Sequence, residues 1–306
     1  VAMITTVAAV HLENFESVEG IADAKAEIFE GLEPGGTAVL PLDNAHYPRL
    51  REAAGRACPD MVPVTFGRSE GADIRLVEAQ LTEEATAVRA SLRGEPWSFR
   101  IGAPGAHLAE NAVGALAAAE AAGADPARAG LALATWSPPE GRGVRTRILL
   151  GPDGLDGVID LLDESFNANP TSVRAALGVL GLMAVEDDIG RIARGRRLAF
   201  LGDMLELGPE ERAMHAGLAE APEMAAVDLV FCCGERMRAL FDALPREKRG
   251  AWFPDSEALA IRAQRTVDAG DVCMVKGSKA ARMGVVVEAI RRLGTPETPG
   301  DAGGTG

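Results

Sequence analysis

The sequence has few aromatic residues, and its acidic side chains outnumber its basic ones. Aromatics make up only 4% of the 306 residues, while alanine, glycine, valine and leucine are abundant. This balance favours layered α/β packing over a β-sandwich. The formal net charge of −14 argues against binding to nucleic acid or to an anionic membrane, because both need basic patches. An anionic substrate is still compatible, since one local cluster of cations can outweigh the overall charge.

Cysteines are also scarce, and they lack the spacing of a metal site or a redox motif. Cys58, Cys232, Cys233 and Cys273 form no CxxC pattern. We therefore expect small buried hydrophobic residues in a reducing compartment. There is no secretory signal and no apolar run of about 18 residues. The sequence predicts a cytoplasmic monomer that neither inserts into a membrane nor binds nucleic acid.

The length predicts two domains, each large enough to bury a core. A segment rich in glycine and proline, residues 136–157, places the boundary near 147–156. Before it, strands at 37–43, 62–66 and 72–79, a hairpin at 85–101 and several helices indicate a mixed sheet. After it, strands and helices alternate, which is typical of a Rossmann-like, doubly wound parallel sheet. We expect an α/β protein with domains at 1–150 and 151–294 and a disordered tail at 295–306.

The stretch 161–177, LLDESFNANPTSVRAAL, is the strongest candidate for a ligand site. An apolar strand ends in Asp163, Glu164 and Ser165, two amides follow at Asn167 and Asn169, and a helix begins directly afterwards. Open α/β sheets bind ligands at the carboxyl ends of their strands, next to helix N-termini. We interpret this stretch as one edge of a site built between the two domains.

Two further strand ends in the second half carry polar groups. Residues 202–215 run from a strand into Gly202-Asp203-Met204, and they bring Glu206 and His215 toward the same sheet edge. Residues 274–283, MVKGSKAARM, place Lys276 at a strand end before a Gly-Ser pair. Parallel strands present their carboxyl ends at one edge of a sheet, so we expect these groups to meet.

The first half offers a histidine and a lysine with chemical interest. His11 follows the first strand, and neutral imidazole is a good ligand for a divalent metal. Lys25 lies fourteen residues later, among alanines on a predicted helix with Ser17 as its N-cap. The alternative is a loop histidine and a solvated lysine.

A glycine-rich loop and a pair of arginines complete the candidates. In GAPGAHLAEN, the loop enters a helix on which His107 and Asn111 lie one turn apart, suited to an anion or a purine edge. The alternative is a helix start packed in the core, and the GxGxxG pattern is absent. Arg142 and Arg145, in PPEGRGVR, suit phosphate binding at a domain boundary or are ordinary surface arginines.

Taken together, these stretches resemble the Mur ligase family of ATP-dependent amide-forming enzymes. The resemblance is carried, in family order over residues 1 to 290, by ITTVAAVHLENFESVEGIADAKAEIFEGL, GAHLAENAVGALAAA, PPEGRG, LLDESFNANPTSVRAAL, LGDMLELG and VKGSKAARM. DESFNANP with GDMLELG is specific for the branch that adds D-alanyl-D-alanine. The resemblance implies a partial central ATPase domain followed by the C-terminal ligase domain.

The resemblance also implies a reaction and its cofactors, ATP and Mg²⁺. ATP phosphorylates the carboxylate of UDP-N-acetylmuramoyl-tripeptide, and the amine of D-alanyl-D-alanine displaces phosphate from the acyl phosphate. This reaction makes a peptidoglycan precursor. Magnesium bridges the phosphate oxygens and offsets their charge.

Site residues follow from the same resemblance. His11 and Lys25, the lysine carbamylated by CO₂, correspond to magnesium ligands and catalytic residues. The nucleotide-binding positions, for adenine and for the phosphates, are His107, Asn111, Arg142 and Glu164. The substrate-binding positions are Asn167, Asn169, Asp203, Glu206 and Lys276.

Several departures from the family pattern bear on activity. Neither a GxxxxGK[ST] phosphate loop nor a uridine-nucleotide-binding domain, both usual in the family, occurs in these 306 residues. Thr6, Leu108, Phe166 and Lys279 replace the residues usual in the family. We therefore expect this polypeptide by itself not to ligate. Two alternatives stay open: a non-catalytic nucleotide- or peptide-binding module, and a related folate-polyglutamate-type ligase.

Overall fold

The structure is a computed structural model that describes residues 1–8, 15 and 17–297. The chain divides into two compact units, Val1–Ser137 and Pro138–Gly306, and each is described by itself. His11 lies outside the described residues, and so do residues 298–306.

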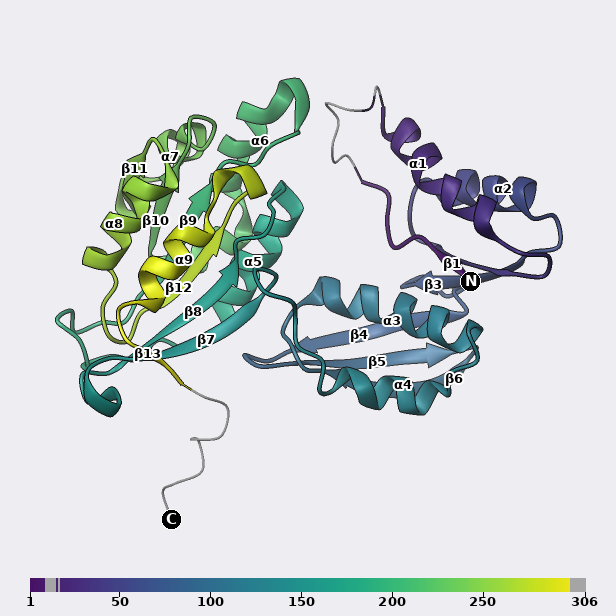
Figure 1. The fold of residues 1–306 in the computed structure, drawn as a ribbon, viewed down its shortest axis with the longest axis horizontal. Coiled ribbons are helices and arrows are strands. Elements are labelled where there is room, and N and C mark those ends of the chain that lie inside the picture. Colours follow the sequence, from purple (N-terminus) through teal and green to yellow (C-terminus); the bar gives the residue numbers. More distant parts are fainter. Residues whose placement is uncertain (9–14, 16, 298–306) are drawn as a thin grey trace, which may run out of the picture. The chain divides into compact units, whose positions relative to one another are not determined.

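Among the described residues of the first unit, six strands form one sheet in the order β1-β2-β3-β4-β5-β6 (Figure 1). The strands are β1 (Ala2–Met3), β2 (Thr37–Pro41), β3 (Val62–Gly67), β4 (Ile74–Leu81), β5 (Thr86–Leu92) and β6 (Glu95–Ile101). The first four are parallel, and the last two form antiparallel pairs. Arg93 and Gly94, both with positive φ, turn the predicted hairpin between β5 and β6, which is confirmed.

Helices cover both faces of the first sheet because the side chains of its strands alternate. They are α1 (Val18–Ala26), α2 (Tyr47–Ala57), α3 (Ala106–Ala121) and α4 (Pro126–Leu133). Leu40 packs in one cluster with residues of α1 and α2, whereas the preceding Val39 packs in another with residues of α3. The side chain of Ser17 accepts a hydrogen bond from Gly20 N, so the predicted N-cap of α1 is confirmed.

The described part of the second unit contains a seven-stranded sheet, in the order β11-β10-β9-β12-β8-β7-β13. The first five of these are parallel, and β7 and β13 pair antiparallel. Along the chain the strands are β7 (Val144–Leu149), β8 (Val158–Glu164), β9 (Arg197–Gly202), β10 (Leu229–Cys233), β11 (Arg249–Phe253), β12 (Val272–Lys276) and β13 (Thr295–Pro296). The predicted α/β class and doubly wound sheet are confirmed.

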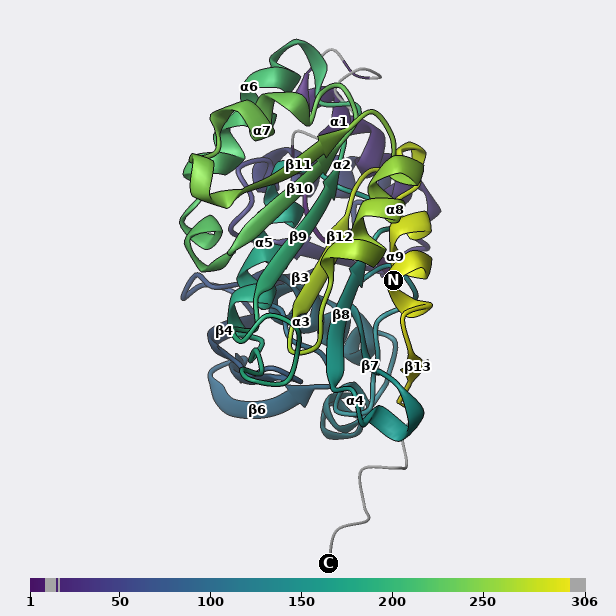
Figure 2. The ribbon, with the colours of Figure 1, turned by 90° about the vertical axis from the view of Figure 1, so that its left-hand side faces the viewer.

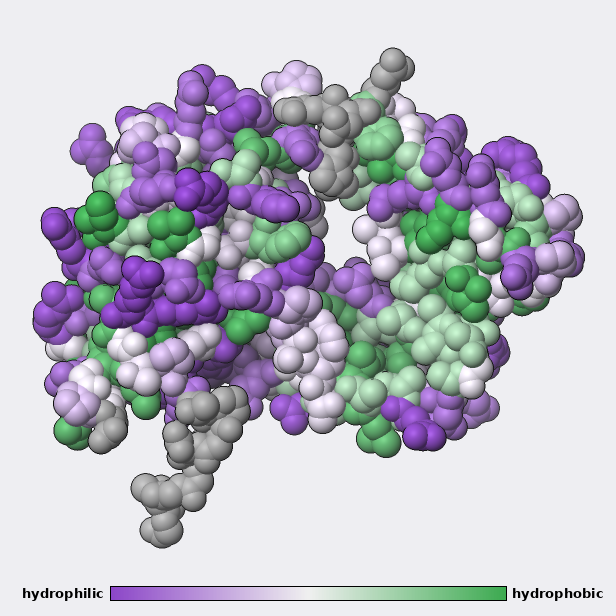
Figure 3. Space-filling view, in the orientation of Figure 1, coloured by the Kyte–Doolittle hydropathy of each residue, from purple (hydrophilic) through white to green (hydrophobic). Residues whose placement is uncertain are grey.

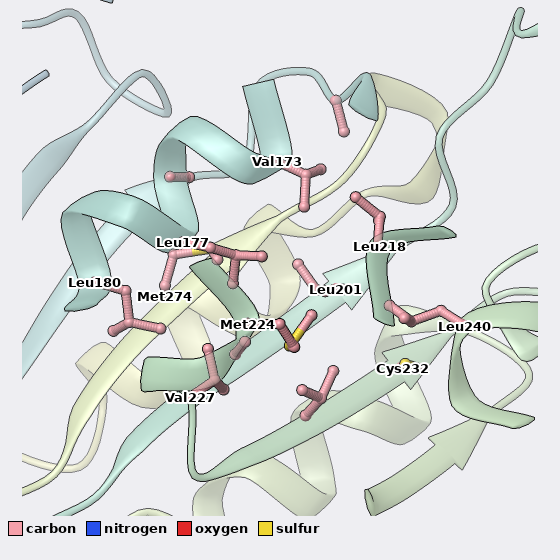
Figure 4. Close-up of a cluster of buried hydrophobic side chains, with 14 of the residues drawn as sticks. Val173, Leu177, Leu180, Leu201, Leu218, Met224, Val227, Cys232, Leu240 and Met274 are labelled. Carbon is pink, nitrogen blue, oxygen red and sulfur yellow. The ribbon is translucent and has the colours of Figure 1, made fainter. Parts of the chain in front are cut away.

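Two groups of helices sandwich the second sheet (Figure 2). The helices α5 (Pro170–Leu182), α6 (Glu211–Gly217) and α7 (Arg238–Ala243) lie over one face, where Leu177, Leu201 and Met274 belong to the cluster of Figure 4. The helices α8 (Ser256–Thr266) and α9 (Gly284–Arg291) cover the other face. Successive residues of one strand point to opposite faces of the sheet, so one lies in the first cluster and the next in the second.

The cysteines of the second unit illustrate this alternation. Cys232 points into the α5 side and Cys233 into the α8 side, and both are buried and free, as expected. Burial raises the pKa of the Cys233 thiol to about 12, because the low-dielectric core disfavours the thiolate. These cysteines are packing residues rather than nucleophiles.

The domain boundary lies earlier than the sequence predicts. The second unit begins at Pro138 instead of near 147–156, because β7 pairs with β8 and buries Ile148 completely. Glycines at 143 and 151 flank this strand, so its residues lie within a segment whose glycine and proline content is typical of a linker. Thr295 and Pro296, which the sequence assigns to a disordered tail, instead form β13 against β7.

Hydrophilic side chains are spread over the face seen in Figure 3, with hydrophobic ones scattered between them. In the part of the chain that the structure describes, no helix is both long and apolar enough to span a membrane.

Candidate functional site

Three neighbouring parallel strands of the second unit end in polar residues at one edge of the sheet. β12 lies between β8 and β9, and Lys276 is in register with Glu164 on one side and with Leu201 on the other. The chain leaving β9 continues through Gly202 to Asp203. The predicted meeting of these strand ends is therefore confirmed.

Lys276 and Glu164 form a buried ion pair at the centre of this edge. The Nζ atom of Lys276 donates to Glu164 Oε2 at 2.9 Å and to the carbonyl oxygen of Asn167 at 3.0 Å. The exposed fractions of the two side chains are 3% for the lysine and 16% for the glutamate. Because a buried ammonium needs such partners, the pair holds the loop after β8 against β12.

The loop after β8 is organised by its own polar side chains. Asp163 Oδ1 accepts hydrogen bonds from the backbone N–H of Ser165, at 3.1 Å, and from its hydroxyl, at 2.6 Å. Asn169 caps α5 in a capping box with Ser172, in which each side chain bonds the other's backbone N–H. The cap uses Oδ1 of Asn169 and leaves its amide NH₂ for other contacts.

The segment Pro138–Gly143 lies against the same loop. Phe166 N donates to the carbonyl oxygen of Gly141 at 3.0 Å, and Gly143 N donates to that of Asp163 at 2.8 Å. The guanidinium of Arg142 stacks on the Phe166 ring, 3.9 Å from its centroid, and residue Phe166 is 43% exposed. The structure thus brings Arg142 beside Glu164's loop, although the two are 22 positions apart in the sequence.

Arg145 has a different environment from Arg142. Its Nε atom pairs with Asp160 Oδ1 at 3.1 Å, between β7 and the adjacent β8. Arg145 is therefore part of the ion pairing inside the sheet rather than of the polar edge.

The loop after β9 is held from three directions. Asp203 Oδ1 accepts from Met237 N at 2.7 Å, and Leu205 N donates to Ser278 Oγ at 2.8 Å. Met204 N donates to His215 Nε2 at 3.0 Å. Within this loop Glu206 has φ +62°, a left-handed conformation that is uncommon for residues other than glycine.

The sequence suggested that His215 faces a crevice. In the structure it has a structural role instead. The ring is fully buried, and Nδ1 lies 2.6 Å from the carbonyl oxygen of Glu211. With Nε2 accepting from Met204, the proton lies on Nδ1 and the ring is neutral. Burial lowers the pKa of His215, because the imidazolium form would be desolvated.

In the first unit, His107 and Asn111 are exposed on the first two turns of α3. The loop before this helix is held by Thr86, whose hydroxyl donates to Ala103 O at 2.9 Å and accepts from Gly105 N at 3.0 Å. Thr86 is fully buried and was not singled out in the sequence, because a threonine inside a strand carries no distinctive signal.

The predicted magnesium ligands are only partly described. Lys25 is exposed on the last turn of α1, while His11 lies outside the described residues. Among the residues that the structure describes, no group of three or more His, Cys, Asp or Glu side chains is arranged to hold a metal ion.

Two family models match the chain, one in each unit. The Mur ligase middle domain matches residues 1–119, and the Mur ligase, glutamate ligase domain matches residues 154–279. The UDP-N-acetylmuramoyl-tripeptide–D-alanyl-D-alanine ligase of Escherichia coli is 32% identical over 303 residues, covering 96% of this chain and 60% of that protein. The ligase of the same name from Bacillus subtilis is 26% identical, covering 94% of this chain and 58% of that protein.

Solved structures agree with the fold. MurF from Acinetobacter baumannii superposes with a TM-score of 0.74 at 23% identity, covering 95% of this chain and 59% of that one. MurF ligase from Thermotoga maritima in complex with ADP has a TM-score of 0.72 at 23% identity, covering 95% of this chain and 61% of that one. The chain thus spans about three fifths of the length of these relatives. Matched by Mur ligase models in both units and by relatives along nearly its whole length, the chain belongs to the Mur ligase family.

Proposed function

We propose that this chain is part of a cytoplasmic, ATP-dependent ligase that adds D-alanyl-D-alanine to UDP-N-acetylmuramoyl-tripeptide in peptidoglycan precursor synthesis. The observation that carries the proposal is the position of DESFNANP and GDMLELG on either side of β12, at one edge of the second sheet. Relatives named for this reaction align with more than nine tenths of the chain.

The residues take roles in this proposal according to their positions. Arg142, held over Phe166, is suited to an anion because its guanidinium is exposed and oriented by the ring. The other proposed nucleotide contacts are His107, Asn111 and Glu164. The loops after β8 and β9 would receive the dipeptide through Asn167, Asn169, Asp203 and Glu206. Lys276, only 3% exposed, would support the β8 loop from inside the domain.

The chemistry requires binding and orientation more than covalent participation by the protein. The γ-phosphoryl group passes from ATP to the tripeptide carboxylate, and ADP leaves. The dipeptide amine then attacks the acyl carbon, the amide bond forms, and inorganic phosphate departs with the acyl C–O bond broken. Amides and carboxylates on rigid loops hold the dipeptide amine near the acyl carbon.

Magnesium belongs to the proposal through His11 and a carbamylated Lys25. When bound, it would offset the charge on the phosphate oxygens. A carbamate converts the lysine from a cation into a carboxylate-like ligand, which suits a hard divalent ion. Of this pair, only Lys25 lies among the residues that the structure describes.

The experiment is a phosphate-release assay on the product of the complete gene, with ATP, UDP-N-acetylmuramoyl-tripeptide and D-alanyl-D-alanine. We expect release that depends on all three and yields the pentapeptide nucleotide by mass spectrometry. Replacing the dipeptide with L-glutamate is the matched control, and activity with glutamate alone would favour a folate-polyglutamate-type ligase. ATP or dipeptide binding without release would favour a non-catalytic module. Either result would overturn the proposal.

A further inference from the structure

The turn Lys276–Gly277–Ser278 occupies a special position in the second sheet. It begins at the last residue of β12, which lies between β8 and β9, so it can reach the loops after both neighbours. Lys276 and Ser278 are both buried, at 3% and 4% exposure, although ammonium and hydroxyl groups are costly to bury without partners. Their hydrogen bonds go to different loops.

On the β8 side, Lys276 closes the loop that contains DESFNANP. Its ammonium joins a side-chain oxygen of Glu164 to the backbone carbonyl of Asn167, three residues further on. A cation between these two acceptors fixes the path of the chain from the end of β8 to the cap of α5. The lysine therefore shapes the loop from inside the domain.

On the β9 side, Ser278 closes the loop that contains GDMLELG. Its backbone N–H donates to the carbonyl oxygen of Asp203 at 2.9 Å, and its hydroxyl accepts from Leu205 N at 2.8 Å. The two bonds span the residues directly before Glu206, whose backbone is left-handed. One serine thus helps hold the loop at its strained position.

Gly277 between them has no space for a side chain. A Cβ atom at this position would lie 2.5 Å from Met283 Cγ and 3.2 Å from the Cα atom of Gly202. The turn is therefore packed directly on the backbone at the end of β9. Its φ angle is not positive, so an alanine here would be opposed by contact alone.

We propose that Lys276, Gly277 and Ser278 are positioning residues that hold the loops after β8 and β9 as one preformed surface. Lys276 orders the first loop and Ser278 orders the second. The close packing of Gly277 fixes the position of one loop relative to the other. The inference rests on the proposed function only in taking this surface as the dipeptide-binding one. The positioning itself is a property of the fold.

Hydrogen exchange measured by NMR on the whole 306-residue chain tests the positioning without any substrate. In Ser278→Ala we expect exchange of the Leu205 amide to become about fivefold to tenfold faster, because one hydrogen bond is lost. Amides of the β8 loop, such as Ser165 and Ala168, should be unchanged. In Lys276→Met, exchange of the β8-loop amides should become faster while that of Leu205 is unchanged. In Gly277→Ala, exchange should become faster in both loops.

The control is Ser256→Ala, which removes another buried serine hydroxyl, in α8, bonded to Glu257. It should leave both loops unchanged. Should Lys276→Met fail to fold, Lys276→Arg keeps the charge but alters its reach, and we expect milder loosening of the β8 loop alone. Equal loosening of both loops by Ser278→Ala, or of neither, would overturn the proposal.

A kinetic experiment on the complete gene product tests what the surface binds. We expect Ser278→Ala to raise KM for D-alanyl-D-alanine about tenfold while leaving KM for ATP unchanged, and Ser278→Thr to restore most of the loss. An equal rise in both KM values would assign the surface to general stability instead of dipeptide binding. If the wild-type enzyme does not ligate, the proposed function fails, while the exchange result still decides the positioning.

Discussion

At the level of single residues, His215 illustrates how burial changes what a titratable side chain does. A histidine near a candidate site suggests acid–base chemistry, yet this one is buried, neutral and bonded to two backbone groups. Its acceptor nitrogen satisfies Met204 N in the loop after β9. Protonation would remove that acceptor and place a charge in the core.

This gives a pH dependence with a definite sign. The pKa of His215 in the folded protein lies below its value of 6.5 in the unfolded chain. The unfolded state therefore binds more protons as the pH falls. The contribution of His215 to stability should be complete above pH 6.5 and should decrease below it.

The measurement is the free energy of unfolding in urea at pH 8 and pH 5, for wild type and for His215→Gln. We expect the wild type to lose more stability than the variant, because glutamine does not titrate. Equal losses would show that His215 is not the group responsible.

Lys25 represents the opposite situation, an exposed side chain whose role would come from a modification. If it carries the proposed carbamate, Lys25→Ala in the complete gene product should reduce ligation by several orders of magnitude. Short carboxylic acids should restore part of the activity, since they can take the place of the carbamate. Full activity of Lys25→Ala would identify the residue as a solvated lysine.

At the level of elements, β7 decides where the second unit begins. Its sequence, VRTRIL, places three polar residues before Ile148, which enters the cluster beneath α8 and α9. The strand also separates β8 from β13 and so moves β8 into the interior of the sheet. The candidate site therefore lies on strands that are hydrogen-bonded on both sides.

Truncation of Ile148 tests this assignment. Ile148→Ala should lower the free energy of unfolding by about 2–4 kcal/mol, because it leaves a cavity in a packed core. Leu155→Ala is the matched control: Leu155 is 84% exposed in the next turn, and its loss should change stability by less than about 0.5 kcal/mol. If both substitutions had similarly small effects on stability, residues 144–149 would be assigned to the linker between the two units.

At the level of the whole molecule, each unit has hydrophobic clusters of its own. Leu40 and Val39 lie in clusters built entirely from the first unit, and Ile148 and Leu201 lie in clusters built entirely from the second. Stability is therefore expected to be local to each unit.

Hydrogen exchange of the whole chain checks this expectation. Leu40→Ala should accelerate exchange of core amides in residues 17–137 and leave those in 138–297 unchanged. Ile148→Ala should do the reverse. Accelerated exchange throughout the chain in either variant would show that the two units unfold as one.

Much of the fold was predictable because its signals are local. Alternating strand and helix patterns, the Ser17 cap and the turn at Arg93-Gly94 depend on residues a few positions apart. The candidate loops were also predictable, since the carboxyl ends of parallel strands share an edge. β7 and the roles of Thr86, His215 and Ser278 were not, because each depends on partners nine or more positions away.

The sequence by itself determined the α/β class, the family resemblance and the list of polar residues at the strand ends, since composition, periodicity and motif order are properties of the chain. Only the tertiary structure decided which of those residues meet. The position of β12 between β8 and β9 joins Lys276 to Glu164, 112 positions apart, and Ser278 to Leu205, 73 positions apart. Strand order arises from long-range packing of two cores, and no local pattern encodes it.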